Sequence, residues 1–151
     1  MYFKHMYCRI SPNLVLEDVC KTNHKDYRKA NIEWGFLKRE NLKKTAIEVY
    51  EPLRARFGQF YINSGIRCPA LNEKINGSKN SAHIEGNALD LRPVDYNILA
   101  SQVFEYLRED KNFLVGQVIL YPDLDFIHVG RYAGLSKRDF RIYEDGKYNK
   151  V

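Results

Sequence analysis

The sequence predicts an α+β domain that has a mainly antiparallel sheet with packed helices. The chain has 151 residues, the usual size of one domain, and no internal repeat or Gly/Ser-rich linker divides it. Apolar residues in the first third recur with helical spacing, whereas short β-prone runs between turn residues dominate the rest. Helices followed by closely spaced strands are typical of the α+β class. We therefore expect residues 1–151 to form a single domain.

Two helices are predicted in the first third of the chain. Ser11-Pro12 predicts the start of a short helix that runs to about Cys20, because proline is tolerated in the first helical turn. A second helix is predicted to end near Gly58, a common residue just after a helix. Its apolar face is marked by residues spaced four, three and four apart, which are Leu42, Ala46, Val49 and Leu53.

Short strands, turns and one further helix are predicted in the remaining two thirds. The predicted strands are 60–63, 88–91, 115–121, 126–129 and, at the edge of the sheet, 139–143. A turn over residues 122–125 would join two of these strands as a hairpin. Between the strands we expect a few helical turns over 69–75, a polar loop over 76–81 and an amphipathic helix over about 98–107.

Composition and charge exclude several classes of protein. With 44% hydrophobic and 28% charged residues, the chain is too apolar to be disordered. No apolar stretch approaches the roughly 20 residues of a membrane span, and the start lacks the apolar segment of a signal peptide. We therefore expect synthesis in the cytoplasm and no membrane insertion. The net charge of +5 is spread along the chain, which favours a mixed-charge surface over a nucleic-acid site.

The three cysteines are predicted to be reduced and mostly packed in the interior. They form no Cys-x-x-Cys pair, and an odd number cannot all be paired within one chain. A buried free cysteine behaves as a small apolar residue. We therefore do not assign the chemistry of the protein to Cys8, Cys20 or Cys68.

The pattern Ser-x-His-x-x-Gly-x-Ala-x-Asp over residues 81–90 indicates a metal site. It places His83 on a loop and Asp90 in the following strand, and Gly86 between them allows a tight bend. His128 lies in a hairpin strand and can supply a third ligand. Two imidazoles and a carboxylate around Zn²⁺, with water in the fourth position, are typical of a catalytic zinc site. A lone histidine is more often a core or surface residue, and Asp90 alone could cap a turn, but the joint pattern favours the metal site.

At these residues the sequence resembles the zinc D-Ala-D-Ala carboxypeptidase family of peptidoglycan peptidases. The family also contains phage L-alanyl-D-glutamate endopeptidases and vancomycin-resistance dipeptidases. Its Ser-Gly-x-Arg-Ser-Pro-x-x-Asn segment resembles residues 64–72, its approach to the first zinc ligand resembles 77–83, and its Trp-x-His-Val resembles 126–129. The resemblance implies a Hedgehog/DD-peptidase-like α+β fold and Zn²⁺ held by three residues, His83, Asp90 and His128.

Further residue roles are implied by the same resemblance. Arg67 matches the family's active-site arginine, which suits a substrate carboxylate or a developing oxyanion. Ser81 is expected to hydrogen-bond the substrate backbone. Asp125 has the family's three-residue spacing before His128 and is the expected general base, with Asp123 as its competitor. Residues three apart on a strand point to opposite faces, so this role requires the backbone to bend at Asp125.

The leading hypothesis is a monomeric zinc metallopeptidase that cuts a peptide bond in the stem peptides or crosslinks of bacterial peptidoglycan. It would be of the D-Ala-D-Ala carboxypeptidase or L-Ala-D-Glu endopeptidase type and serve phage lysis or cell-wall remodelling. Without a signal peptide, it would reach the wall after release through a holin-type pore or as a virion component. The alternative is a catalytically inactive zinc-containing binding module on the same fold. A basic nucleic-acid binder is a third reading, which only the net charge supports.

Overall fold

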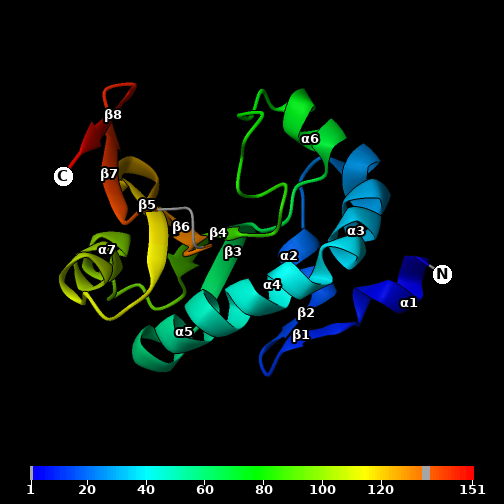
Figure 1. The fold of residues 1–151 in the computed structure, drawn as a ribbon, viewed down its shortest axis with the longest axis horizontal. Coiled ribbons are helices and arrows are strands. Elements are labelled where there is room, and N and C mark those ends of the chain that lie inside the picture. Colours follow the sequence, from blue (N-terminus) through cyan, green and yellow to red (C-terminus); the bar gives the residue numbers. More distant parts are fainter. Residues whose placement is uncertain (1, 134–136) are drawn as a thin grey trace.

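The computed structural model describes residues 2–133 and 137–151, in which helices pack against a six-stranded sheet (Figure 1). Neighbouring strands are antiparallel, except that β5 and β7 run parallel. The predicted α+β class with a mainly antiparallel sheet is confirmed. In spatial order the strands are β3 (Phe60–Ser64), β4 (Ala88–Pro93), β6 (Phe126–Arg131), β5 (Val115–Tyr121), β7 (Asp139–Glu144) and β8 (Lys147–Lys150).

The longest helical stretch covers residues 39–57, where the sequence predicts its second helix. It consists of α4 (Arg39–Thr45), a π-helical turn (Ala46–Tyr50) and α5 (Glu51–Phe57), and Gly58 ends it with a φ of +82°. Short 3₁₀ turns occupy Lys25–Tyr27 and Pro122–Leu124. The other helices are α1 (Tyr2–Met6), α2 (Leu16–Cys20), α3 (Arg28–Leu37), α6 (Pro69–Lys74) and α7 (Ala100–Glu109).

One face of the sheet carries the hydrophobic core. Alternate residues of β4, β5 and β6 pack there against α7 and the 39–57 helix. All four residues of the predicted apolar stripe, Leu42, Ala46, Val49 and Leu53, are buried in this core. Burying one large apolar side chain stabilises a fold by about 1.5–3 kcal/mol. The opposite face of the same strands is therefore left for polar side chains, and it bears the functional site.

The N-terminal helix begins later than the sequence predicts. Residues 9–15 form a small hairpin of β1 (Arg9–Ser11) and β2 (Leu14–Val15), and α2 starts only at Leu16. Glu51 of α5 explains the difference, because its carboxylate accepts hydrogen bonds from the Ser11 hydroxyl at 2.6 Å and from Asn13. A tertiary contact thus overrides the helix start predicted at Ser11-Pro12.

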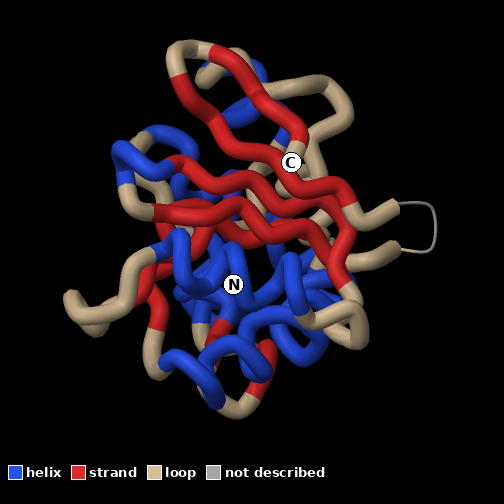
Figure 2. The backbone as a smooth tube through the Cα atoms, turned by 90° about the vertical axis from the view of Figure 1, so that its left-hand side faces the viewer, coloured by secondary structure: helices blue, strands red, loops and turns tan. Residues whose placement is uncertain are grey.

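β7 is not an edge strand, contrary to the prediction for 139–143. β8 pairs with β7 on its outer side, and the two strands are joined by Asp145-Gly146 with φ values of +52° and +74°. An Asp-Gly pair with positive φ is a strong hairpin signal, and it was present in the sequence. Figure 2 shows the strands side by side as one sheet across the molecule.

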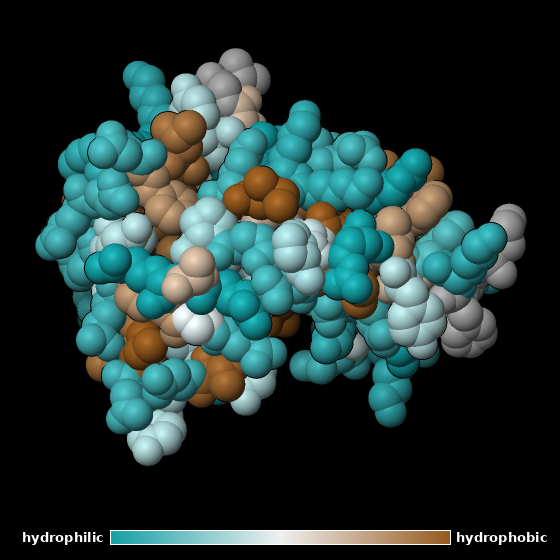
Figure 3. All heavy atoms as spheres, turned by 90° about the horizontal axis from the view of Figure 1, so that it is seen from below, coloured by the Kyte–Doolittle hydropathy of each residue, from teal (hydrophilic) through white to brown (hydrophobic). Residues whose placement is uncertain are grey.

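The surface gives no sign of a continuous apolar face on the side drawn in Figure 3. Hydrophilic residues dominate that view, and hydrophobic residues are scattered among them. Single exposed apolar residues are normal on folded proteins. Among the described residues, no helix combines the length and apolar character needed to cross a membrane.

Candidate metal centre

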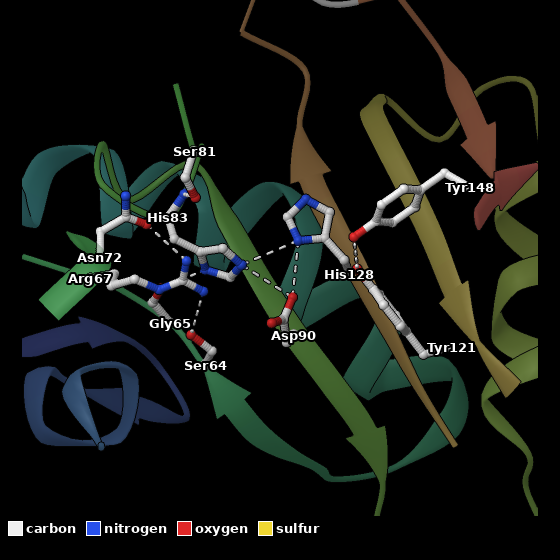
Figure 4. A network of polar contacts seen from close by, with 10 residues as sticks. All are labelled: Ser64, Gly65, Arg67, Asn72, Ser81, His83, Asp90, Tyr121, His128 and Tyr148. Carbon is white, nitrogen blue, oxygen red and sulfur yellow. Dashed lines mark hydrogen bonds and ion pairs between the residues drawn. The ribbon is translucent and has the colours of Figure 1, made fainter. Parts of the chain in front are cut away.

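The three predicted metal ligands converge at one point. Asp90 of β4 and His128 of β6 are direct cross-strand partners, so their side chains stand next to each other on the polar face of the sheet. His83 reaches the same point from the loop before β4 (Figure 4). His128 Nδ1 lies 2.9 Å from Asp90 Oδ1, and His83 Nε2 lies 3.2 Å from both of these atoms. The side chains come from different elements, and only the folded chain unites them.

The protons of this group indicate that a cation belongs between the side chains. His83 Nδ1 lies 2.7 Å from the carbonyl oxygen of Gly65, which can only accept, so Nδ1 must carry the proton. In a neutral imidazole, Nε2 then directs a lone pair at Asp90 and His128. The Asp90 carboxylate is also an acceptor. At most one proton, on His128 Nδ1, is left to separate three electron-rich atoms, an arrangement that suits a metal ion.

The ionisation of the group also fits a metal site, since ligands must be neutral imidazole or ionised carboxylate. Burial alone would raise the pKa of Asp90, but its hydrogen bonds with His83 and His128, and the charge of these imidazoles when they are protonated, outweigh it and hold the pKa well below its usual range. Burial lowers the pKa of His128 and outweighs the opposing effect of the hydrogen bond that His128 donates to Asp90. Two imidazoles and a carboxylate are a donor set that Zn²⁺ accepts, with room for water as a fourth ligand.

Side chains from α3 and the start of the 39–57 helix hold the loop that carries His83. They bind successive carbonyl oxygens of the loop, and Lys38 pairs with the Glu85 carboxylate at 2.7 Å. Gly86 has a φ of +73°, which confirms the tight bend predicted there. The remaining contacts run from Trp34 to Ile84, from Asn41 to Glu85 and from Thr45 to Gly86. Both the carboxylate and the carbonyl oxygen of Glu85 therefore bind side chains on the helix side of the loop.

Arg67 lines the same cleft and is held in place by hydrogen bonds. Its Nη1 donates to Asn72 Oδ1 at 3.0 Å, Nη2 to Ser64 Oγ at 3.5 Å, and its backbone N–H to the His83 carbonyl at 3.0 Å. The Asn72 amide nitrogen in turn donates to the carbonyl oxygen of Ser78. Asn72 was known from the sequence only as a matching residue of the family segment. The structure assigns it the task of orienting the guanidinium.

A second asparagine, Asn31 of α3, supports the segment around Arg67. It is fully buried, and its amide nitrogen donates to the carbonyl oxygens of Cys20 and Ile66 at 2.8 and 3.1 Å. Its oxygen accepts the backbone N–H of Cys68 at 2.8 Å. Nothing in the sequence marks Asn31 as a supporting residue, because a polar residue on a helix gives no signal until its packing is known. Cys20 and Cys68 are buried free thiols, as predicted.

The two remaining predicted site residues, Ser81 and Asp125, lie in different surroundings. Ser81 lines the cleft, and its hydroxyl accepts the backbone N–H of His83 at 3.3 Å. The backbone does bend at Asp125, which has a φ of +49°, but Asp125 is not among the described residues that line the cleft. Asp125 Oδ1 instead accepts the N–H of Ala100 at 2.8 Å, at the first residue of α7. The carboxylate is therefore held at the start of α7 in this structure, and the role of Asp125 as general base stays a prediction.

His83, Asp90 and His128 line an open cleft of about 800 Å³. One wall is the 76–83 loop with Arg67. The other is formed by β7, β8, Lys137 and Arg138. The lining contains more cationic side chains than carboxylates. The carboxylates are those of Asp90 and Asp139, and the cationic residues are Arg67, Arg131, Lys137, Arg138 and Lys150. A cleft of this charge favours an anionic substrate.

Comparison with known proteins agrees with this geometry. A family model described as Peptidase M15 matches residues 19–130, which include the three predicted ligands, Arg67 and Ser81. The chain belongs to the peptidase M15 family. No curated protein matches it. Members of the family are zinc metallopeptidases of peptidoglycan, so the resemblance found in the sequence is confirmed, and the chain is a metallopeptidase of this class.

Proposed function

We propose that this M15 peptidase binds one zinc ion through His83, Asp90 and His128 and hydrolyses an amide bond in the stem peptides or crosslinks of peptidoglycan. The observation that carries the proposal is the convergence of the three ligand atoms, all within 4.8 Å of one another, in an open cleft. When bound there, zinc would supply an acidified water molecule and polarise a carbonyl group.

The residues around the ligands have separate roles in this proposal. Arg67 presents a planar fork of donors to a substrate carboxylate or to the carbonyl oxygen that becomes negative during hydrolysis. Ser81 lines the cleft and hydrogen-bonds the substrate backbone. A carboxylate must also accept the proton of the attacking water. For Asp125 to do this, its carboxylate has to leave the N–H of Ala100.

Endopeptidase cleavage is the finer proposal for the reaction. The cleft continues from the metal group toward β7 and β8, and its volume of about 800 Å³ exceeds what a terminal pair of alanines would fill. This favours an internal bond of the stem peptide, such as L-alanyl-D-glutamate, over a terminal D-Ala-D-Ala bond. Such cleavage degrades the wall and would suit phage lysis. Mass spectrometry of digested peptidoglycan distinguishes the two, because only a carboxypeptidase releases free D-alanine.

Zinc analysis combined with a peptidoglycan assay tests the proposal. The wild type should contain one zinc per chain and release new amino groups from purified peptidoglycan. His83→Ala, Asp90→Ala and His128→Ala should each lose zinc and activity. His24→Ala removes an exposed histidine outside the cleft and is the matched control. Full zinc content and activity in His83→Ala would refute the ligand assignment, whereas bound zinc without hydrolysis in the wild type would support the inactive binding module.

A further inference from the structure

A cluster of aromatic side chains lies beside the metal group on the polar face of the sheet. On β5, Ile119 is the cross-strand partner of His128, and Tyr121 lies two residues farther on, so its side chain points to the same face. The ring of Tyr121 stacks on Phe126 with 4.4 Å between the centroids and 10° between the planes. This stacking fixes the ring and directs its hydroxyl along the cleft. Tyr121 accordingly lines the cleft together with His128.

The C-terminal hairpin adds a second tyrosine to this cluster. Tyr148 of β8 brings its hydroxyl to 3.4 Å from the hydroxyl of Tyr121, and both hydroxyls lie on the His128 side of their rings in Figure 4. Tyr143 of β7 packs against both rings, with centroids 5.3 Å from that of Tyr121 and 4.8 Å from that of Tyr148. Tyr148 follows the segment matched by the family model, which ends at residue 130.

The two hydroxyls together have one proton to donate elsewhere. Each phenol carries one proton and can also accept, and the bond between Tyr121 and Tyr148 uses a single proton. The second O–H of the pair is left for an acceptor in the cleft. Burial, and then the contact with Tyr148, raise the pKa of Tyr121. Tyr121 therefore keeps its proton at neutral pH and can act as a hydrogen-bond donor.

The position of the pair complements that of Arg67. Arg67 belongs to the 64–72 segment on one side of the metal group, whereas Tyr121 and Tyr148 belong to the strands on the other side (Figure 4). A substrate in the cleft would thus have donors on both sides of the ligands. A preorganised donor directed at an oxygen that becomes negative in the transition state lowers the barrier of the reaction.

We propose that Tyr121 is a further catalytic residue, whose hydroxyl donates a hydrogen bond to the substrate oxygen on which negative charge develops, and that Tyr148 is the positioning residue that orients this hydroxyl. The inference rests on the proposed peptidase function and goes beyond the ligands and Arg67. No bond is formed or broken by Tyr121, and its proton remains on the phenol.

Kinetics and inhibitor binding of phenylalanine variants test the inference. Tyr121→Phe keeps the ring stacked on Phe126 and removes only the hydroxyl, so we expect kcat to fall by about tenfold to a hundredfold, with zinc content and KM nearly unchanged. The Kd of a phosphinate analogue of the cleaved bond should rise by a similar factor, because phosphinates imitate the charge of the transition state. Tyr148→Phe should show a smaller loss of about threefold to tenfold in both measurements. Tyr143→Phe, in the same cluster but outside the cleft lining, should match the wild type.

The outcomes separate this inference from the proposed function. If the wild type with zinc does not hydrolyse peptidoglycan, the proposed function fails. If the wild type is active and Tyr121→Phe has wild-type kcat and phosphinate affinity, the role of Tyr121 is refuted. A defective Tyr148→Phe beside a normal Tyr121→Phe would overturn the assignment of the donor to Tyr121. An equal loss in Tyr143→Phe would show that the cluster acts only by packing the hairpin.

Discussion

Gly77 stands where any side chain would disturb the orientation of Arg67. A Cβ atom at this position would lie 2.1 Å from Asn72 Oδ1 and 2.9 Å from Arg67 Nη1. The backbone of Gly77 is outside the left-handed region, so alanine meets only this steric conflict. Asn72 is buried and bonded at both ends of its amide, so it cannot move aside without releasing Arg67 or the Ser78 carbonyl. Gly77→Ala is therefore a selective perturbation of the guanidinium.

The expected loss follows from the size of this overlap. To restore ordinary contact, the Asn72 amide must move by about 1 Å, and a displacement of this size in a catalytic site can cost on the order of a hundredfold in rate. That factor corresponds to ~2.7 kcal/mol of transition-state free energy. Zinc content should stay at one per chain, because the atoms nearest to a Cβ at Gly77 belong to Asn72 and Arg67 and not to the proposed ligands. The midpoint temperature of thermal unfolding should change little, whereas kcat should fall.

Steady-state kinetics on soluble peptidoglycan fragments, with metal content measured for each variant, provide the assay. Lys79→Ala changes an exposed residue of the same loop and should behave as the wild type. In a double-mutant cycle with Asn72→Ala, the two losses should be strongly non-additive, because both act by releasing Arg67. Wild-type kcat in Gly77→Ala, or additive losses in the cycle, would refute this account of how Arg67 is oriented.

Three further predictions follow from the same geometry. Arg67→Lys should keep its zinc but lose about tenfold or more in kcat, since an ammonium lacks the two-pronged contact; unchanged kinetics would leave Arg67 a structural cation. Asp125→Ala should lower the free energy of unfolding by about 1 kcal/mol in urea titrations, because α7 loses its cap at Ala100. Asp125→Asn keeps an acceptor for this N–H and should keep the stability, but it should lose about a hundredfold in kcat because an amide cannot take the proton of the attacking water; a stable and fully active Asp125→Asn would refute Asp125 as the general base. The zinc-free protein should lose stability as the pH falls below about 6.5. Burial lowers the pKa of His128 in the folded protein, so the unfolded chain takes up this proton at a higher pH than the folded chain does. A urea midpoint that is constant down to about pH 5 would contradict this.

Local patterns determined much of the architecture. The apolar spacing of Leu42, Ala46, Val49 and Leu53 predicted a buried helical face, and Val115 to Tyr121 was predicted as the strand that the structure contains. Such patterns are reliable because periodic burial is a property of a single element. The sequence also identified the predicted ligands, since residue type and spacing single out His83, Asp90 and His128 before any fold is known.

Tertiary structure alone decided which side chains meet. Glu51 turns residues 9–15 into a hairpin, and the N–H of Ala100 draws Asp125 away from the cleft although its spacing before His128 suits a general base. Asn31 and the Tyr121–Tyr148 pair depend in the same way on elements distant in sequence. Residue type and spacing determine which groups a chain can offer. Where each group points depends on competing partners that only the packed chain brings within hydrogen-bonding distance.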